Sequence, residues 1–443
     1  MINTLKMILS KKNLSYALLC FFTLFTYSTL RSEKDAFVIT FMGPEFIPSL
    51  KLFGVSFFSI AAFFIFSKLS NMLSKNTIYY LFLYSFFSFL LVFVLLFPFL
   101  DKIAPACFQF YLPLKYYMLS LFYIFAELWG ALMLTLLFWR LCNDSISYQD
   151  SKTLYPLFTL IGNFGLVASG LLQKFLAQHP LYILSIVLVA IVGCNFCYYF
   201  INKNLDPSLI NINSKQKTKL NLKDSIKLLA HSSIVKLVTI TVLSYGITIN
   251  LFELIWKSYM KLAFPSVSAY LSSMGNLQLF SGIASICFML SAPFFLKKFS
   301  WRTCALFTPI SIFCLAGSFF IFTFFKMTPP FILFVAAFGL CQESLSKGIK
   351  YAFFDPTKEA CFIGASNEVK AKGKAAADML GGRLGKCSGS VFALISMSLS
   401  SLPLIKLSPL FFAFFILIIS VWIFAIFFFD KKIIKEKSTV SLC

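Results

Sequence analysis

Four charged residues lie inside or at the edge of apolar runs that are long enough to cross a membrane. Glu127 lies within Phe122–Gly130, Glu253 lies near the end of its run, Lys51 stands at the start of one, and Lys386 lies about ten residues into another. An ionised side chain in hydrocarbon costs at least about 2.5 kcal/mol, so each needs an opposite charge, a water-filled cavity or a proton. These residues are therefore candidates for binding a charged substrate.

Each candidate also has a purely structural interpretation. Glu127 and Glu253 can form ion pairs that only hold helices together, and Lys51 can be an interfacial lysine whose ammonium reaches water. Lys386 lies too deep in its run for that, which favours an anion-binding role. Arg383, one turn before it, is a second candidate cation.

The run that carries Lys386 also has a small-residue face. Gly381, Gly385 and Gly389 recur at four-residue spacing, so we expect another helix to approach closely there. The segment does not form a phosphate-binding P-loop, because Leu380 stands where the first glycine is required and no strand precedes it.

The composition is that of a polytopic membrane protein. Of 443 residues, 59% are hydrophobic and 13% are charged, and the mean hydropathy is +0.84. This is too apolar for a soluble protein. A bilayer core of ~30 Å needs about 20 apolar residues per helix. Runs of roughly this length occupy residues 14–30, 50–66, 78–100, 115–141, 154–176, 181–201, 234–256, 270–296, 303–325, 328–346, 375–400 and 406–429. The sequence thus predicts an all-α membrane protein with twelve transmembrane helices.

The longest clearly hydrophilic connection before residue 351 divides these helices into six and six. We predict an N-terminal six-helix bundle at 1–201, a basic cytoplasmic linker at 202–230, a C-terminal six-helix bundle at 231–430 and a cytoplasmic tail at 431–443. Two similar bundles related by an axis along the membrane normal are typical of major-facilitator-like transporters, whose substrates bind near the midplane.

The basic residues predict the orientation. With the N-terminus inside, 27 Lys and Arg lie on the inner side and 10 on the outer side, and the remaining two, Arg383 and Lys386, lie inside a helix. This asymmetry places both termini in the cytoplasm. The net charge of +22 therefore reflects topology, and we expect no nucleic-acid partner.

Several chemistries are disfavoured at the residue level. The only histidines, His179 and His231, lie on opposite sides of the membrane in this topology, so they cannot share a metal. Cys194 and Cys197 lie within an apolar run, where we expect small buried hydrophobic residues. No nucleophile with a nearby base stands out, so we expect no enzyme, no metal and no cofactor.

The motifs resemble those of the ATP/ADP translocase (nucleotide transporter) family of intracellular bacteria and plastids. The resemblance runs in order along most of the chain. It rests on Arg31–Asp35, Phe46–Leu52, Lys68–Asn71, Ala126–Gly130, Leu137–Trp139, Tyr155–Phe158, Phe252–Ser258, Met274–Asn276, Lys350–Glu359, Val369–Ala376 and Arg383–Lys386.

The resemblance implies a nucleotide antiporter that exchanges external ATP for internal ADP, with phosphate as a possible co-substrate. It implies an inner bacterial membrane, and its important charges fall on Lys51, Glu127, Glu253 and Lys386. We expect a monomer in a lipid bilayer, in which these cations and Arg383 bind phosphates and the glutamates pair with the cations when the site is empty. The alternative is a broader-specificity importer with net or proton-coupled uptake.

Overall fold

The protein is helical in every described segment. The computed structural model describes residues 11–103, 108–146, 148–203, 232–325, 327–362, 377 and 381–440. Their contacts divide the chain into two compact units, each treated by itself below. Unit 1 comprises the described residues of Met1–Gly43, Phe53–Lys217 and Phe264–Ile283, and unit 2 those of Pro44–Leu52, Thr218–Ala263 and Ala284–Cys443.

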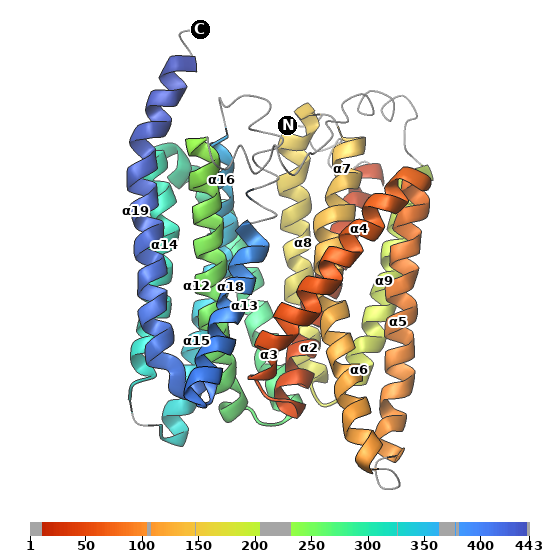
Figure 1. The fold of residues 1–443 in the computed structure, drawn as a ribbon. Helices are drawn as coiled ribbons and strands as arrows, with labels where there is room; N and C mark the ends of the chain where they lie inside the picture. The colour runs from red at the N-terminus through yellow and green to blue at the C-terminus, as the bar shows by residue number, and fades with distance from the viewer. Residues whose placement is uncertain are drawn as a thin grey trace. The chain divides into compact units, whose positions relative to one another are not determined.

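Unit 1 contains most of the N-terminal half (Figure 1). Its elements are α2 (Lys11–Phe41), α4 (Ser56–Met72), α5 (Lys75–Ile103), α6 (Phe108–Trp129), the π-helix η2 (Gly130–Phe138), α7 (Trp139–Ser145), α8 (Tyr148–Leu176) and α9 (Pro180–Lys203). The first part of α13 (Val267–Lys298) also belongs to it.

Unit 2 begins with a short segment between α2 and α4 and continues in the C-terminal half. Its elements are α3 (Phe46–Ser49), the start of the π-helix η1 (Leu50–Val55), α12 (Ser233–Ala263), the second part of α13, α14 (Trp301–Phe322), α15 (Pro329–Ile349), the π-helix η4 (Lys350–Phe354), α16 (Asp355–Ala360), α18 (Gly382–Ser400), the 3₁₀-helix η7 (Leu404–Leu407) and α19 (Ser408–Val440).

The predicted all-α membrane fold is confirmed. Eleven helices among the described residues are long and apolar enough to cross a membrane, and Leu384–Ser400 forms a shorter apolar helix. These twelve segments correspond to the twelve predicted runs, although the first part of the predicted 375–400 run lies largely outside the described residues.

Two helices extend beyond their predicted ends. We expected the first to end near Leu30, yet α2 continues to Phe41 and carries Arg31–Asp35 within it. No Gly or Pro interrupts it before Gly43, which adopts a positive φ of 94°. We likewise expected a polar connection after residue 346, but helical structure continues through η4 and α16 to Ala360. Both predicted helices ended too early, because the charged residues that follow each apolar run were taken as the end of the helix.

The centre of unit 1 is α2, which packs against α6, α8 and α9. Close approach to α8 requires glycine, since a Cβ on Gly165 would lie 2.6 Å from the Phe21 carbonyl oxygen. The indole of Trp129 donates to the Thr23 carbonyl at 3.1 Å and fixes α6 on α2. Cys194 and Cys197 are free and buried in this unit, as predicted.

The centre of unit 2 is α12, which packs against α15, α18 and α19 (Figure 1). The predicted small-residue face on α18 is confirmed: a Cβ on Gly385 would lie 2.9 Å from the Leu243 carbonyl oxygen and 3.1 Å from the Gly246 Cα. On another side of α12, the Trp256 indole donates to the Ala336 carbonyl at 2.9 Å. Backbone contact of α12 with α18 thus positions the residues on both.

We predict that Gly385→Ala lowers the stability of the folded protein, because the added methyl group must displace backbone of α12. Overpacking of this kind costs about 1–3 kcal/mol, which thermal unfolding of the detergent-purified protein will register as a lower Tm. The matched control is Gly382→Ala on the same helix, where a Cβ meets no atom of the described residues within 4 Å. Equal Tm values for the two variants would contradict the packing described.

Candidate functional site

Lys51 and Glu253, two of the predicted site residues, form an ion pair within unit 2. The Lys51 ammonium lies 3.3 Å from Glu253 Oε2 and donates to Asn250 Oδ1 at 2.6 Å. The Lys51 side chain is only 14% exposed and the Glu253 side chain 9% exposed. Because Lys51 has these partners on α12, it is held inside the unit, unlike a lysine that merely reaches water.

A second lysine shares the same carboxylate oxygen. Lys257, one helical turn after Glu253 on α12, places its ammonium 3.9 Å from Glu253 Oε2 and is buried. Two cations therefore converge on one carboxylate in a poorly hydrated place. Removing one member of a buried pair is strongly unfavourable, since the remaining charge loses its compensation.

Asn250 connects this cluster to α18. Its amide nitrogen donates to the Lys386 carbonyl oxygen at 2.7 Å and lies 3.2 Å from Ser390 Oγ. The room for this amide comes from Gly389, whose absent Cβ would lie 2.7 Å from Asn250 Nδ2. One asparagine thus contacts the Lys51 ammonium with its oxygen and the α18 backbone with its nitrogen.

Lys386, the third predicted residue in unit 2, presents its side chain differently. The side chain is exposed, and among the described residues its ammonium makes no hydrogen bond or ion pair. An exposed ammonium deep in a membrane-spanning helix is stable only where it meets water or an anion. The side chain of Arg383, also predicted, lies outside the described part of the chain.

Glu127, the predicted site residue in unit 1, pairs with a lysine that the sequence interpretation placed in an external loop. Glu127 Oε1 lies 3.0 Å from the Lys34 ammonium, which also lies 2.9 Å from Asp35 Oδ1. The same ammonium stands 3.9 Å from the centre of the Tyr123 ring. This lysine is almost fully buried between two carboxylates and an aromatic face, an arrangement that stabilises the cation.

Glu33, next to this cluster, was not predicted. It is fully buried, and neither carboxylate oxygen has a hydrogen-bond partner within the described ranges. A charged carboxylate in such a place is costly, so we expect a neutral, protonated Glu33. The signal that could have found Glu33, Lys34 and Asp35 was an apolar pattern that resumes after the five consecutive polar residues Arg31–Asp35 and continues to Phe41.

Unit 2 also holds a buried charged pair at the end of the predicted 328–346 run, in which Glu343 lies inside the run and Lys347 lies one residue beyond it. On α15, Lys347 places its ammonium 3.4 Å from Glu343 Oε1, one turn away. Both side chains are buried, and Gln342 beside them donates to Ser346 Oγ at 3.0 Å. Helical continuity through Ile349, which the sequence interpretation ended too early, places this pair inside a membrane-spanning segment.

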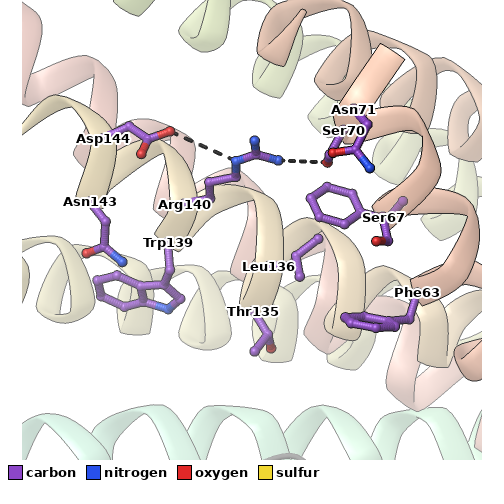
Figure 2. Close-up of a pocket in the computed structure, with 11 residues that line it drawn as sticks. Phe63, Ser67, Ser70, Asn71, Thr135, Leu136, Trp139, Arg140, Asn143 and Asp144 are labelled. Carbon is purple, nitrogen blue, oxygen red and sulfur yellow. Dashed lines mark hydrogen bonds and ion pairs between the residues drawn. The ribbon is translucent and has the colours of Figure 1, made fainter. Parts of the chain in front are cut away.

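Unit 1 also contains a pocket of about 580 Å³ between α4 and the η2–α7 segment (Figure 2). Figure 2 shows Arg140 reaching from α7 toward Ser70 and Asn71 of α4. None of the charged residues predicted from the sequence lines it.

The cluster of Lys51, Lys257 and Glu253 has two ammonium groups and one carboxylate, a balance that suits an anionic guest. The cluster of Lys34, Asp35 and Glu127 has one ammonium group and two carboxylates, so it has no such surplus of positive charge. No group of three or more His, Cys, Asp or Glu residues that could hold a metal occurs within the segments described.

The fold defines the class of protein. The chain aligns with a solved nucleoside transporter, NupG, over 94% of its length and 99% of that protein at a TM-score of 0.64 and 14% identity. It also aligns with FucP, a Major Facilitator Superfamily transporter, over 94% of its length and 98% of that protein, with a TM-score of 0.51 and 14% identity. The chain therefore shares its fold with these transporters, as the sequence predicts.

Sequence comparison then identifies the family. A sequence model of the TLC ATP/ADP transporter family matches residues 2–433. ADP,ATP carrier protein 1 of Rickettsia typhi is 33% identical over 94% of this chain and 92% of the relative, and its counterpart in Chlamydia pneumoniae is 33% identical over 86% and 83%. The chain belongs to the TLC ATP/ADP transporter family.

We predict that Glu253→Gln destabilises the protein by about 3 kcal/mol, because two partly buried lysines lose their shared carboxylate. The matched control is Glu33→Gln, the same substitution at a buried carboxyl without a hydrogen-bond partner in the described structure. We expect it to change stability by less than about 1 kcal/mol. Denaturant unfolding of the purified variants measures both, and a larger loss for Glu33→Gln would refute this electrostatic interpretation.

Proposed function

We propose that the protein is a nucleotide antiporter that exchanges external ATP for internal ADP by alternating access. The observation that carries the proposal is the shared ion pair of Lys51, Lys257 and Glu253 in a chain of the TLC ATP/ADP transporter family. A polyphosphate bears several negative charges in a short length, so it can take the place of one carboxylate between two ammonium groups.

The empty carrier and the loaded carrier differ in the partners of their lysines. Without nucleotide, Lys51 binds Glu253 and Asn250. With nucleotide, the phosphates bind Lys51, and the exposed Lys386 supplies a further cation with Arg383 one turn before it. Asn250 maintains the spacing, since it contacts both Lys51 and the backbone at Lys386. Partner exchange of this kind lowers the cost of binding, because no cation has to be left bare.

Glu127 takes the corresponding part in unit 1. It shares the Lys34 ammonium with Asp35, so a change at Glu127 leaves that lysine with one carboxylate. We infer that this cluster keeps unit 1 neutral enough to remain in the membrane while it changes conformation. Aromatic side chains stack on the base, as every base offers a π-face.

The charge asymmetry and the relatives support the proposed orientation and location. The excess of basic residues on one side supports cytoplasmic termini, and the bacterial relatives support a bacterial inner membrane. We propose that the two six-helix bundles at 1–201 and 231–430 are the bodies that move during alternating access. ADP leaves with or without phosphate, and we expect a monomer to suffice.

A second function has one observation in its favour. The buried carboxyl of Glu33, which we expect to be protonated, is the kind of group that carries a proton in a proton-coupled importer. Such a carrier takes up nucleotide into vesicles that hold none, and external acid accelerates that uptake. An obligate antiporter takes up nothing under the same conditions.

We predict that Lys51→Ala, Glu127→Gln and Lys386→Ala each abolish exchange of labelled ATP for internal ADP while the protein still inserts into the membrane. Lys51→Ala and Lys386→Ala each remove a cation that we place at the phosphates, and Glu127→Gln removes a carboxylate that balances Lys34 in unit 1. Uptake into intact bacteria that express the variants, followed by a chase with external ADP, measures exchange.

Lys297→Ala, at the exposed end of α13, is the control that we expect to exchange normally. Competition with ADP, GTP, CTP and NAD then gives the specificity, and normal exchange in Lys51→Ala and Lys386→Ala would refute the assigned roles.

We also predict that a membrane potential shifts the equilibrium of exchange in proteoliposomes. Import of ATP against export of ADP moves about one net negative charge, worth about 2.3 kcal/mol per 100 mV. At equilibrium, the internal-to-external ratio of ATP can be divided by the internal-to-external ratio of ADP. An inside-negative potential of about 100 mV should lower this quotient roughly 50-fold. If the quotient does not change with the potential, phosphate or a proton must move during exchange and cancel the net charge.

A further inference from the structure

The pocket between α4 and the η2–α7 segment has the size and the chemical groups of a small-molecule site. Its volume of about 580 Å³ falls within the ~300–1,000 Å³ typical of ligand pockets. The walls combine aromatic, amide, hydroxyl and charged side chains: Phe63, Phe66, Ser67, Ser70, Asn71, Thr135, Leu136, Trp139, Arg140, Asn143 and Asp144. All belong to unit 1, so the pocket forms within one body.

Arg140 is the cationic anchor of the pocket. Its Nη1 donates to Ser70 Oγ at 3.1 Å, and its guanidinium carbon lies 5.3 Å from the centre of the Phe66 ring. A guanidinium has five N–H donors, and within the described chain the bond to Ser70 is the hydrogen bond that Arg140 makes. Figure 2 shows the guanidinium between Ser70 and Asp144, with a dashed line to each. The remaining donors can form the paired hydrogen bonds that arginine makes to phosphate.

The carboxylate nearest to Arg140 is already engaged by another cation. Asp144 Oδ2 accepts a hydrogen bond from the Lys75 ammonium at 2.7 Å but lies 3.9 Å from Arg140 Nε. Lys75 is therefore the closer partner of Asp144. The three side chains together carry two positive charges and one negative charge, which favours an anion beside Arg140 rather than a second cation.

The rest of the pocket offers a planar apolar surface and amides. Trp139 packs edge-on against Tyr155 with 5.2 Å between ring centres, and Asn143 Oδ1 accepts from the Tyr155 hydroxyl at 2.7 Å. These contacts with Tyr155 hold Trp139 and Asn143 in position. Phe63 and Asn71 stand on the opposite helix (Figure 2). Aromatic rings bind nucleobases by stacking, at about 1–3 kcal/mol per base.

The π-helix η2 contributes to the shape of the pocket. It begins at Gly130, where a Cβ would lie 2.4 Å from the Tyr27 ring, and Thr135 donates back to the Gly130 carbonyl at 2.9 Å. The wider turns rotate the residues that follow relative to a regular α-helix. π-Helical segments of this kind frequently occur at functional sites.

We propose that this pocket is a second nucleotide site, in which Arg140 binds a phosphate and the wall of Trp139, Phe63 and Phe66 binds the base of one mononucleotide. The proposal rests on the proposed nucleotide transport and adds a place where nucleotide waits before it reaches the Lys51–Glu253 cluster. The predicted orientation puts the ends of α4 and α7 in the cytoplasm, so the pocket receives the internal nucleotide. An anionic phospholipid shares the phosphate chemistry, and the test below separates the two.

The test is photolabelling of the full-length protein in phospholipid nanodiscs with 8-azido-ADP, followed by peptide mapping. We expect label within residues 63–71 or 135–144, and we expect unlabelled ADP to compete for it. Arg140→Gln should lower this labelling about tenfold, as expected for loss of charge-assisted hydrogen bonds. Ser67→Trp fills the pocket from an exposed position and should lower the labelling without removing a charge. This second variant tests the pocket even if Arg140→Gln fails to fold.

The matched control is Arg302→Gln at the start of α14, which removes an arginine that does not line the pocket and should label as the wild type does. Label that is absent from both segments, or that neither pocket variant reduces, overturns the proposal. Loss of a co-purified anionic phospholipid in Arg140→Gln with unchanged labelling makes the pocket a lipid site and also overturns it. Exchange is assayed separately in proteoliposomes. Normal exchange in a protein whose pocket is not labelled refutes only the pocket proposal. A labelled pocket in a protein that does not exchange nucleotides refutes only the proposed antiport.

Discussion

The structure depends on one constraint: a charge in an apolar unit must be shared with another charge. Lys51 and Lys257 share one oxygen of Glu253, and Lys34 is shared by Asp35 and Glu127. The shared group stays paired when one of its partners moves away: Glu253 keeps the other lysine, and Lys34 keeps the other carboxylate. A simple one-to-one ion pair in the same place would be harder to open, since opening it exposes two charges at once.

Glycine and asparagine make this sharing geometrically possible. The contact between Gly246 and Gly385 brings the backbone of α18 against α12, close enough for Asn250 to span the two helices. A larger residue at either glycine would separate the helices, and the Asn250 amide could no longer reach the carbonyl of Lys386. The packing of small residues and the electrostatics of the cluster are therefore one arrangement, in which backbone proximity sets the position of Lys51 through a neutral side chain.

The sequence predicts the helices and the individual charges far better than the pairing between them. Hydropathy suffices for twelve apolar segments, because length and apolarity are local properties. The pairing of Lys51 with Glu253 joins residues 202 positions apart, and only the proposal that glutamates pair with cations in the empty site anticipated it. Lys34 was missed as the partner of Glu127 because five polar residues in a row, Arg31–Asp35, were taken as the end of a helix. Inside α2 their charges are compensated by one another and by α6, which no local pattern encodes.

The π-helical segments explain another part of what local patterns miss. Lys51 lies in η1, and η2 leads directly into Trp139 and Arg140. A π-turn changes the direction of every later side chain by adding a residue to the turn, so a period of 3.6 assigns those residues to the wrong face. Hydropathy is nearly unaffected by such a change, whereas the face of each polar residue depends on it. Polar residues that follow a π-segment in a membrane helix therefore need tertiary information, and Arg140, unremarkable in sequence, acquires its position at the pocket in this way.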